Sequence, residues 1–219
     1  MKTKALVAIA ASLVFCAGML LPVFGQELKA IQLPEPKLNE NKSLAQALKD
    51  RKTTRAYALD NLSEQTLSNL LWAAFGINRP DSGRRTAPSA KNWQEIEVYV
   101  ATTTGMYLYD PKGNALVPIV AGDIRSLTYT QATFKDAPIH LVYVADLEKM
   151  GEDEEGSKLV LAGMDTGFVA ENVYLYCACE GLNTGFRVTI DKEKLAQALH
   201  LRPTQRIMAA QSIGLPKSK

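Results

Sequence analysis

The sequence predicts an α+β domain that follows a removable export signal. Three observations support this prediction. Helix-period and strand-period apolar patterns both occur, they do not alternate as regular β–α–β units, and the first 25 residues differ in character from the rest. The chain has 219 residues, of which 47% are hydrophobic and 22% charged, enough for one sizeable core. We therefore expect a signal peptide over residues 1–25, a polar linker over 26–41 and one domain over 42–219.

The first 25 residues have the layout of a secretory signal peptide. Lys2 and Lys4 precede the apolar run ALVAIAASLVFCAGMLL, and Gly25 stands just before the polar QELK. We therefore expect a periplasmic or secreted protein. The alternative is an uncleaved, membrane-anchored protein, since the apolar run is nearly long enough to span a bilayer. Lipid attachment at Cys16 is disfavoured because Phe15 stands where a small residue is expected.

Charge and cysteine content exclude several functional classes. The signal holds two of the 25 basic residues and no acidic one, so its removal leaves 23 basic and 23 acidic residues. A neutral chain is not a general nucleic-acid binder. Cys177 and Cys179 point about 200° apart on a helix and should not form a disulfide. With only His140 and His200 besides, and no paired-ligand spacing, we expect no metal site.

Two helices are expected in the first part of the domain. The first covers residues 43–52, with Ser43 as its N-cap. The second covers 62–77, where Ser63 is the N-cap candidate and Gly76 ends the helix. The residues expected on their apolar faces are Leu44, Ala47, Leu48, Leu67, Leu70, Leu71 and Ala74.

The middle of the chain changes to a strand period. Apolar and polar residues alternate over 95–100 and again over 105–110, and the turn sequence PKGN separates the latter from ALVPI at 115–119. This pattern predicts a strand followed by a hairpin. The mostly apolar run at 137–146 predicts a central strand, and the charged stretch at 148–158 predicts a loop.

The longest helix is expected over residues 164–182. Asp165 or Thr166 can cap its start, and Gly181 can end it. The elements that follow are a strand-like piece over 184–190, a helix over 191–201 that begins at Asp191, and a last strand over 205–216.

This longest helix is apolar on nearly all sides, which predicts a homodimer. Its large apolar residues spread around the axis instead of forming one stripe. A single domain covers one face of such a helix, and a two-fold partner can cover another. The alternative is a central helix wrapped entirely by its own chain. The residues concerned are Phe168, Val169, Val173, Leu175 and Tyr176.

A short basic cluster, RKTTRAY at residues 51–57, directly follows the first helix. In an extended segment Arg51, Thr53 and Arg55 point to one side, whereas Lys52 and Thr54 point to the other. Guanidinium groups and hydroxyls in this arrangement suit one phosphate group. The alternative is a solvated helix end, where cations meet the helix dipole favourably.

A second polar stretch, RRTAPSAKNW, covers residues 84–93. Pro88 favours a turn, and Ser89 and Asn92 offer hydrogen bonds on a surface of small residues. This surface could pack against a flat ligand, or it could be a plain loop that leads into the next strand. We expect Trp72 and Trp93 to be core or interface aromatics.

The ordered set of these segments resembles the nitroreductase family of flavin proteins, within it the branch of the SagB-type dehydrogenases. The first matching segments are LAQALKDRKTTRAY, LSEQTLSNLLWAAFGIN and GRRTAPSAKNWQEIEVYV, the last followed by a YxYDP hairpin. DAPIHLVYVAD, DTGFVAENVYLYCACEGLNTGF and SIGLPK continue the match, so the resemblance covers roughly residues 42–219. No single motif is very specific, but their order is.

The resemblance implies a homodimer with a mostly antiparallel central sheet flanked by helices and FMN at the subunit interface. The implied phosphate and ribityl contacts are Arg51, Thr53 and Arg55, with Lys217 as a further phosphate contact from either chain. The implied lining of the flavin is Pro88, Ser89, Ala90 and Asn92. Arg187, Val188 and Thr189 are implied beside its reactive edge, where a backbone N–H would meet N5.

The implied function is hydride transfer through flavin N5 to a small organic acceptor, with no catalytic side chain required. The alternative is a non-catalytic flavin- or ligand-binding protein on the same dimeric fold. Two departures from the family motivate it. Lys91 stands where relatives commonly have glycine, within the unusual run Lys91-Asn92-Trp93-Gln94, and an export signal precedes the domain. The sequence does not identify the electron donor or acceptor.

Overall fold

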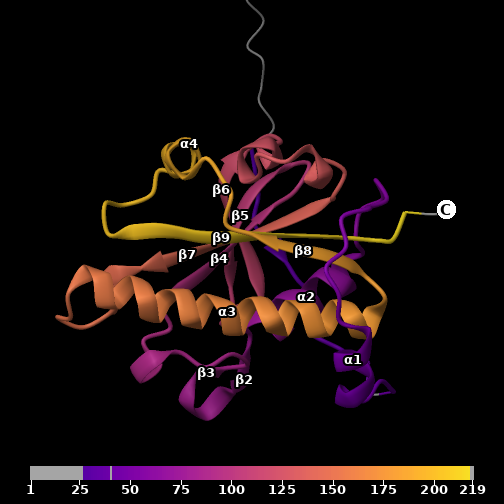
Figure 1. Ribbon diagram of the computed structural model, residues 1–219, viewed down its shortest axis with the longest axis horizontal. Coiled ribbons are helices and arrows are strands. Elements are labelled where there is room, and N and C mark those ends of the chain that lie inside the picture. The colour runs from indigo at the N-terminus through magenta and orange to yellow at the C-terminus, as the bar shows by residue number, and fades with distance from the viewer. Residues whose placement is uncertain (1–26, 40, 218–219) are drawn as a thin grey trace, which may run out of the picture.

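The computed structural model describes residues 27–39 and 41–217, so the expected signal peptide lies outside the described residues. Figure 1 shows a central sheet with the long helix α3 running along one of its faces. Helices α1 and α2 lie on the same side as α3, and α4 lies on the opposite side. Among the described residues, no helix is both long enough and apolar enough to cross a membrane.

The described helices and strands follow the predicted order closely. The helices are α1 (Leu44–Asp50), α2 (Glu64–Phe75), α3 (Glu155–Glu180) and α4 (Lys192–Ala198). The strands are β1 (Ile31–Gln32), β2 (Ile77–Arg79), β3 (Arg84–Arg85), β4 (Ile96–Ala101), β5 (Gly105–Asp110), β6 (Ala115–Ala121), β7 (Ile139–Asp146), β8 (Asn183–Arg187) and β9 (Gln205–Gly214). Short 3-10 turns complete the described fold, of which η2 (Ala90–Asn92), η3 (Arg125–Thr128), η4 (Ala132–Phe134) and η5 (Leu147–Lys149) matter below.

Seven strands form the main sheet in the order β1-β6-β5-β4-β7-β9-β8, and each neighbouring pair is antiparallel. The predicted α+β class and antiparallel sheet are therefore confirmed. The predicted central strand is β7, which lies between β4 and β9 and is buried along its whole length. At the end of the order, β8 pairs only with β9, which leaves one edge of β8 open to other segments.

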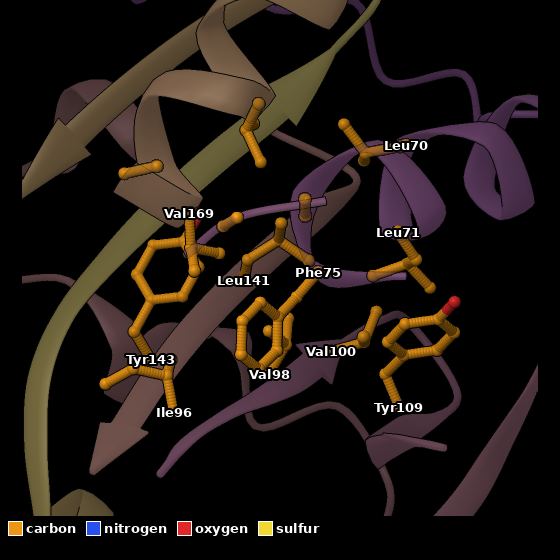
Figure 2. Packing of buried hydrophobic residues seen from close by; sticks show 14 of the residues in the cluster. Leu70, Leu71, Phe75, Ile96, Val98, Val100, Tyr109, Leu141, Tyr143 and Val169 are labelled. Carbon is orange, nitrogen blue, oxygen red and sulfur yellow. The ribbon is translucent and has the colours of Figure 1, made fainter. Parts of the chain in front are cut away.

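Two apolar layers sandwich the sheet. The larger one lies between the sheet and helices α2 and α3, and Figure 2 shows Leu70, Leu71 and Phe75 of α2 packed above Val98 and Val100 of β4. The alternation along β4 sends Tyr99 and Ala101 to the opposite face, where they belong to a second apolar cluster that includes Leu195 of α4. Burial on both faces explains why β4 and β7 are apolar almost throughout.

The predicted helix caps are confirmed in the first half of the domain. The Ser43 side chain accepts a hydrogen bond from Gln46 N, and the Ser63 side chain accepts one from Thr66 N. Gly76 ends α2, as expected. On α1, however, Leu44 and Leu48 are 65% and 56% exposed, so residues 27–39 and 41–217 leave their apolar face uncovered.

The predicted start of the longest helix was wrong. Helix α3 begins at Glu155, inside the stretch expected to be a loop, and Asp165 is buried in mid-helix instead of capping it. Acidic residues suit a helix start because of the helix dipole, and Glu155 stands in the first turn. Gly181, with φ 68°, ends the helix as predicted.

Two further differences concern short segments. The stretch before residue 42 is extended, as expected, but it also packs on the domain: β1 pairs with β6, and Leu33 is buried. Strands β2 and β3 form a small two-stranded sheet that the sequence patterns did not predict. In the last part of the chain, α4 starts one residue after the expected start at Asp191, which caps it with its side chain accepting from Lys194 N.

Candidate functional site

The basic cluster forms an extended segment between α1 and Tyr57. The Arg51 guanidinium lies 5.3 Å from the centre of the Tyr174 ring, and the Arg55 guanidinium lies 5.6 Å from the centre of the Phe134 ring. Neither arginine has an acidic partner within the described residues. Two cations therefore rest on aromatic rings with donors left for an anion.

Thr53 joins this segment to α3 and to the edge of the sheet. Its hydroxyl lies 2.9 Å from the Tyr174 hydroxyl, which also accepts a hydrogen bond of 3.0 Å from Phe186 N of β8. Because Tyr174 accepts from Phe186, its own proton can be donated to Thr53. This arrangement leaves the Thr53 hydroxyl proton free to donate to a further oxygen.

Thr54 ties the segment to β8, and the expected alternation of Arg51, Thr53 and Arg55 stays a prediction. Thr54 faces β8, where its backbone N–H donates to Thr184 O and its Oγ1 accepts from Thr184 N. Lys52 lines a cavity of about 450 Å³ together with Lys42, Lys49 and Tyr174. Lysines at this place meet the C-terminal end of α3, and Lys42 Nζ donates to Ala178 O.

The C-terminal segment lies directly beside the basic cluster. Tyr57 and Pro216 form an isolated antiparallel bridge, Ala58 N donates to Leu215 O, and Lys217 N donates to Ala56 O. This pairing places the Lys217 backbone next to Arg55, from the other end of the domain. Three cations, Arg51, Arg55 and Lys217, therefore gather at one end of the molecule.

The open edge of β8 presents a row of backbone donors. Thr184 N is bonded to Thr54 and Phe186 N to Tyr174, and alternation puts Val188 N next in the same row. No hydrogen bond from Val188 N is found within the described residues. Val188 itself is 59% exposed. The edge therefore offers a ligand one accessible N–H beside the cationic cluster.

Arg187 points away from this edge into a buried polar cluster. Its Nη1 donates to Ser212 Oγ at 2.7 Å, its Nη2 donates to Thr128 O at 2.8 Å and lies 3.0 Å from His140 Nδ1, and the guanidinium lies over Phe134. Burial lowers the pKa of Arg187 to about 10 and, with the nearby Arg187 charge, lowers the pKa of His140 to about 3. Arg187 is thus charged and His140 neutral near pH 7.

The sequence stretch 88–94 forms a tight turn at the other half of α3. Asn92 N donates to Ser89 O, and Gln94 N donates to Ser89 Oγ at 3.0 Å. Ala90 N donates to Asp165 Oδ2 of α3 at 2.8 Å. Pro88 and Asn92 are exposed, so this turn presents a small polar surface.

Within one chain the two groups of residues are separated along α3. Thr53 meets the helix at Tyr174, whereas Ala90 meets it at Asp165. These positions are nine residues apart, or about 13 Å along a helix axis. Figure 1 shows the same separation, with α1 near one end of α3 and the β2–β3 hairpin below its other half.

One face of α3 is left uncovered by the part of the chain that the structure describes. Val160, Met164 and Phe168, each four residues apart, are 58%, 57% and 48% exposed. Gly163 and Gly167 lie on the same face and would allow another helix to approach closely. The described residues therefore do not wrap α3 on all sides.

Several residues of this region carried no recognisable signal in the sequence. Tyr174 and Phe134, which contact the basic segment, are ordinary core residues by pattern, and Asp165, which holds the 88–94 turn, was expected only as a helix cap. Trp93 is half-buried against the core, as expected for a packing aromatic. Trp72 is also half-buried, and its indole N–H donates to Ile77 O.

Comparisons with known proteins agree on one family. The model of the nitroreductase family matches residues 48–215 of the chain. A Methanocaldococcus jannaschii protein assigned as a nitroreductase is 30% identical over 164 residues, which cover 70% of this chain and 81% of that protein.

Solved structures show the same fold. A Ralstonia eutropha protein assigned as a nitroreductase superposes with a TM-score of 0.84 at 37% identity, covering 89% of this chain and 93% of the other. A chain of the Escherichia coli microcin synthetase McbBCD complex superposes with a TM-score of 0.66 at 22% identity, covering 96% of this chain and 85% of the other.

Proposed function

The chain belongs to the nitroreductase family of oxidoreductases, and from this premise we propose that it is an exported, homodimeric, FMN-dependent enzyme that reduces a small organic acceptor. The observation that carries the proposal is the group Arg51, Arg55 and Lys217 beside the accessible N–H of Val188. Cations without acidic partners, gathered on a neutral protein, call for an anionic ligand.

The residues present fit FMN. Its phosphate needs paired donors and a hydroxyl, and Arg51, Arg55 and Thr53 of one short segment carry these groups. Lys217 adds a third cation from the adjacent backbone. The Val188 backbone N–H is the donor available to a ring nitrogen. The Arg187 side chain is engaged with Ser212, so Arg187 would contribute to the site only through the position of its backbone.

A second copy of the chain would complete the site. The 88–94 turn and the basic segment lie about 13 Å apart along one α3 helix, too far for close contact with one ring edge. Suppose that a two-fold axis crosses the middle of α3, between Gly167 and Phe168, so that the two α3 helices run antiparallel. The partner's Asp165 then lies at the same height along the helix axis as residue 170 of this chain. The separation from Tyr174 then falls to about 6 Å along the axis.

The exposed face of α3 is suited to this contact. Met164 and Phe168 project from it, and Gly163 and Gly167 leave room for side chains of an antiparallel copy. Leu44 and Leu48 of α1 extend the uncovered apolar surface. Burying these groups against a second copy removes apolar area from water, which favours association.

Bound FMN would supply the hydride chemistry that its ring system makes possible. The chain's own residues bind and orient. Arg51, Thr53 and Arg55 would hold the phosphate, Val188 N–H would donate to the ring, and the partner's 88–94 turn, with its Pro88, Ser89, Ala90 and Asn92, would cover a face of the ring and exclude water there. Thr189 is held by Thr130 and Gln131 and would line the same edge.

Export is supported by the signal-like residues 1–25. We propose that cleavage near Gly25 releases a periplasmic or secreted protein. Cell fractionation with mass measurement of the mature chain tests this: a full-length protein in the membrane fraction would instead support the anchored form.

Cofactor content and reduction test the proposed function. The protein without its first 25 residues should purify yellow, release FMN on denaturation and lose its flavin colour when mixed anaerobically with a reductant. Flavin that is bound but never reduced by nicotinamide or other donors would favour the non-catalytic alternative. Absence of FMN binding at any concentration tested would overturn the proposal.

A further inference from the structure

The 88–94 turn is held in an unusual backbone conformation. Three of its residues have positive φ without being glycine: Lys91 at 49°, Asn92 at 57° and Gln94 at 52°. Left-handed conformations are disfavoured for residues with a Cβ, because the side chain approaches the carbonyl oxygen. They persist only where surrounding contacts hold them, and they gather at functional sites.

Asp165 supplies the contact that ties this turn to α3. Ser89 accepts hydrogen bonds from within the turn, whereas Asp165 Oδ2 accepts from Ala90 N at 2.8 Å across 75 residues of sequence. Asp165 is 3% exposed and lies on the helix face that packs on the sheet. Its orientation therefore determines where Ser89 and Ala90 stand.

Glu95, directly after the turn, is the side chain that faces Asp165. It is fully buried, and neither of its carboxylate oxygens has a hydrogen-bond donor within the described residues. Asp165 is the neighbouring carboxyl with which Glu95 can form a hydrogen bond once one of the two carries a proton. Two carboxyl groups in contact, out of water, cannot both be ionised at an acceptable cost, so one of them must carry a proton.

The other charged groups around this pair have their own partners. Lys149 of η5 binds Glu97 of β4 at 2.7 Å, Glu148 of η5 pairs with Arg202, and Lys91 of η2 pairs with Asp153 at 3.4 Å. Lys149 acts on Glu95 only at longer range. Burial, with Asp165 adding to it, raises the pKa of Glu95 to about 7.

We propose that Glu95 and Asp165 share one proton and together position the 88–94 turn, so that the turn loosens when this proton is lost. With the proton on Glu95, its hydroxyl donates to Asp165, and Asp165 stays free to accept from Ala90 N–H. Without it, two negative charges face each other and repel. Because the proposed function places this turn on the flavin, FMN affinity should then depend on the same proton.

Glu95→Gln tests the pair because an amide keeps the shape and the donor but cannot titrate. Glu97→Gln is the matched control, two residues along the same strand and paired with Lys149. FMN affinity is titrated by flavin fluorescence from about pH 5.5 to about pH 8.5 for all three proteins. Titration of the FMN phosphate itself is common to all three and cancels in their ratios.

We expect the wild-type and Glu97→Gln proteins to lose affinity relative to Glu95→Gln by up to about tenfold per pH unit above about pH 7. If the FMN affinities of Glu95→Gln and the wild type depend on pH in the same way, the proposal that Glu95 and Asp165 share a proton is wrong.

Hydrogen exchange tests the pair without FMN. Exchange of the peptide covering 88–94, corrected for the intrinsic pH dependence, should accelerate above about pH 7 in the wild type but not in Glu95→Gln. If neither the wild type nor the two variants bind FMN, the proposed function fails. The hydrogen-exchange measurement still tests whether Glu95 and Asp165 share a proton. If Glu95→Gln does not fold, infrared spectra of the wild type test the shared proton instead. The C=O stretch of a buried protonated carboxyl must disappear when the pH is raised. Unchanged exchange, or no such band, overturns the proposal.

Discussion

Replacing either arginine of the basic segment should weaken FMN binding strongly. Arg51→Ala removes a half-buried guanidinium that lies over Tyr174, and Arg55→Ala removes an exposed one that lies over Phe134. Neither arginine has an acidic partner among the described residues. Each variant therefore loses an interaction with the ligand without breaking an internal ion pair.

The expected size follows from this geometry. A charge-assisted hydrogen bond contributes about 1.5–3 kcal/mol, so each variant should bind FMN roughly 10- to 150-fold more weakly. Loss of the contact with the aromatic ring costs about 0.5–1 kcal/mol of folding stability, too little to unfold the domain. Arg51→Lys should lie between the wild type and Arg51→Ala, because it keeps the charge but loses the paired donors.

Lys52→Ala is the matched control. It removes a cation from the same segment, but no aromatic ring lies under Lys52 among the described contacts, and Lys52 lines a cavity with Lys42 and Lys49. Its effect is limited to long-range attraction through solvent, about 0.2–1 kcal/mol, or less than about fivefold in affinity. Quenching of flavin fluorescence gives the dissociation constants, and circular dichroism melting confirms that each variant is folded.

Two results would refute the reasoning. Equal FMN affinity of Arg51→Ala, Arg55→Ala and the wild type would remove the phosphate from this segment. An equal loss in Lys52→Ala and the arginine variants would mean that general positive charge attracts FMN, without a built phosphate site.

Three further predictions concern assembly, packing and acid stability. Phe168→Glu, at the uncovered face of α3, should turn a dimer into a monomer in sedimentation at low micromolar concentration and should weaken FMN binding. Leu59→Glu, at a residue that is 78% exposed and lies outside that helix, should change neither. A well-folded wild-type monomer would contradict the dimer. Gly185→Ala should destabilise the domain by about 1–3 kcal/mol in urea unfolding, because its Cβ would meet Phe134 Cε1 at 2.9 Å, while Gly156→Ala, with open space around it in α3, should stabilise by about 0.5–1 kcal/mol. His140 has its pKa lowered from 6.5 to about 3 by burial, so its contribution to stability is present above about pH 6.5 and falls as the pH drops towards 3. His140→Asn should therefore lose less stability than the wild type between about pH 7 and about pH 4.5, and identical losses would show that His140 does not titrate in this window.

The sequence predicted those features that depend on neighbouring residues. The caps at Ser43, Ser63 and Asp191 require only a side-chain oxygen within reach of a backbone N–H two or three residues on. The alternation predicted for Arg51, Thr53 and Arg55 requires only an extended backbone, and the segment is neither helical nor part of a named strand. The start of α3 was missed because Gly156 and the charges around it weaken the local helix signal, while packing on the sheet decides the outcome.

Features that join distant segments were decided by the tertiary structure. The sequence alone determined that a cationic segment, a small polar turn and an unusually apolar helix exist. Only the fold placed Lys217 beside Ala56, left Val188 N–H on an open sheet edge, and brought Asp165 and Glu95 together beneath the turn. The physical reason is range: local pattern is set by steric and hydrogen-bonding preferences over a few residues, whereas strand order and helix packing are set by burial of the whole apolar surface.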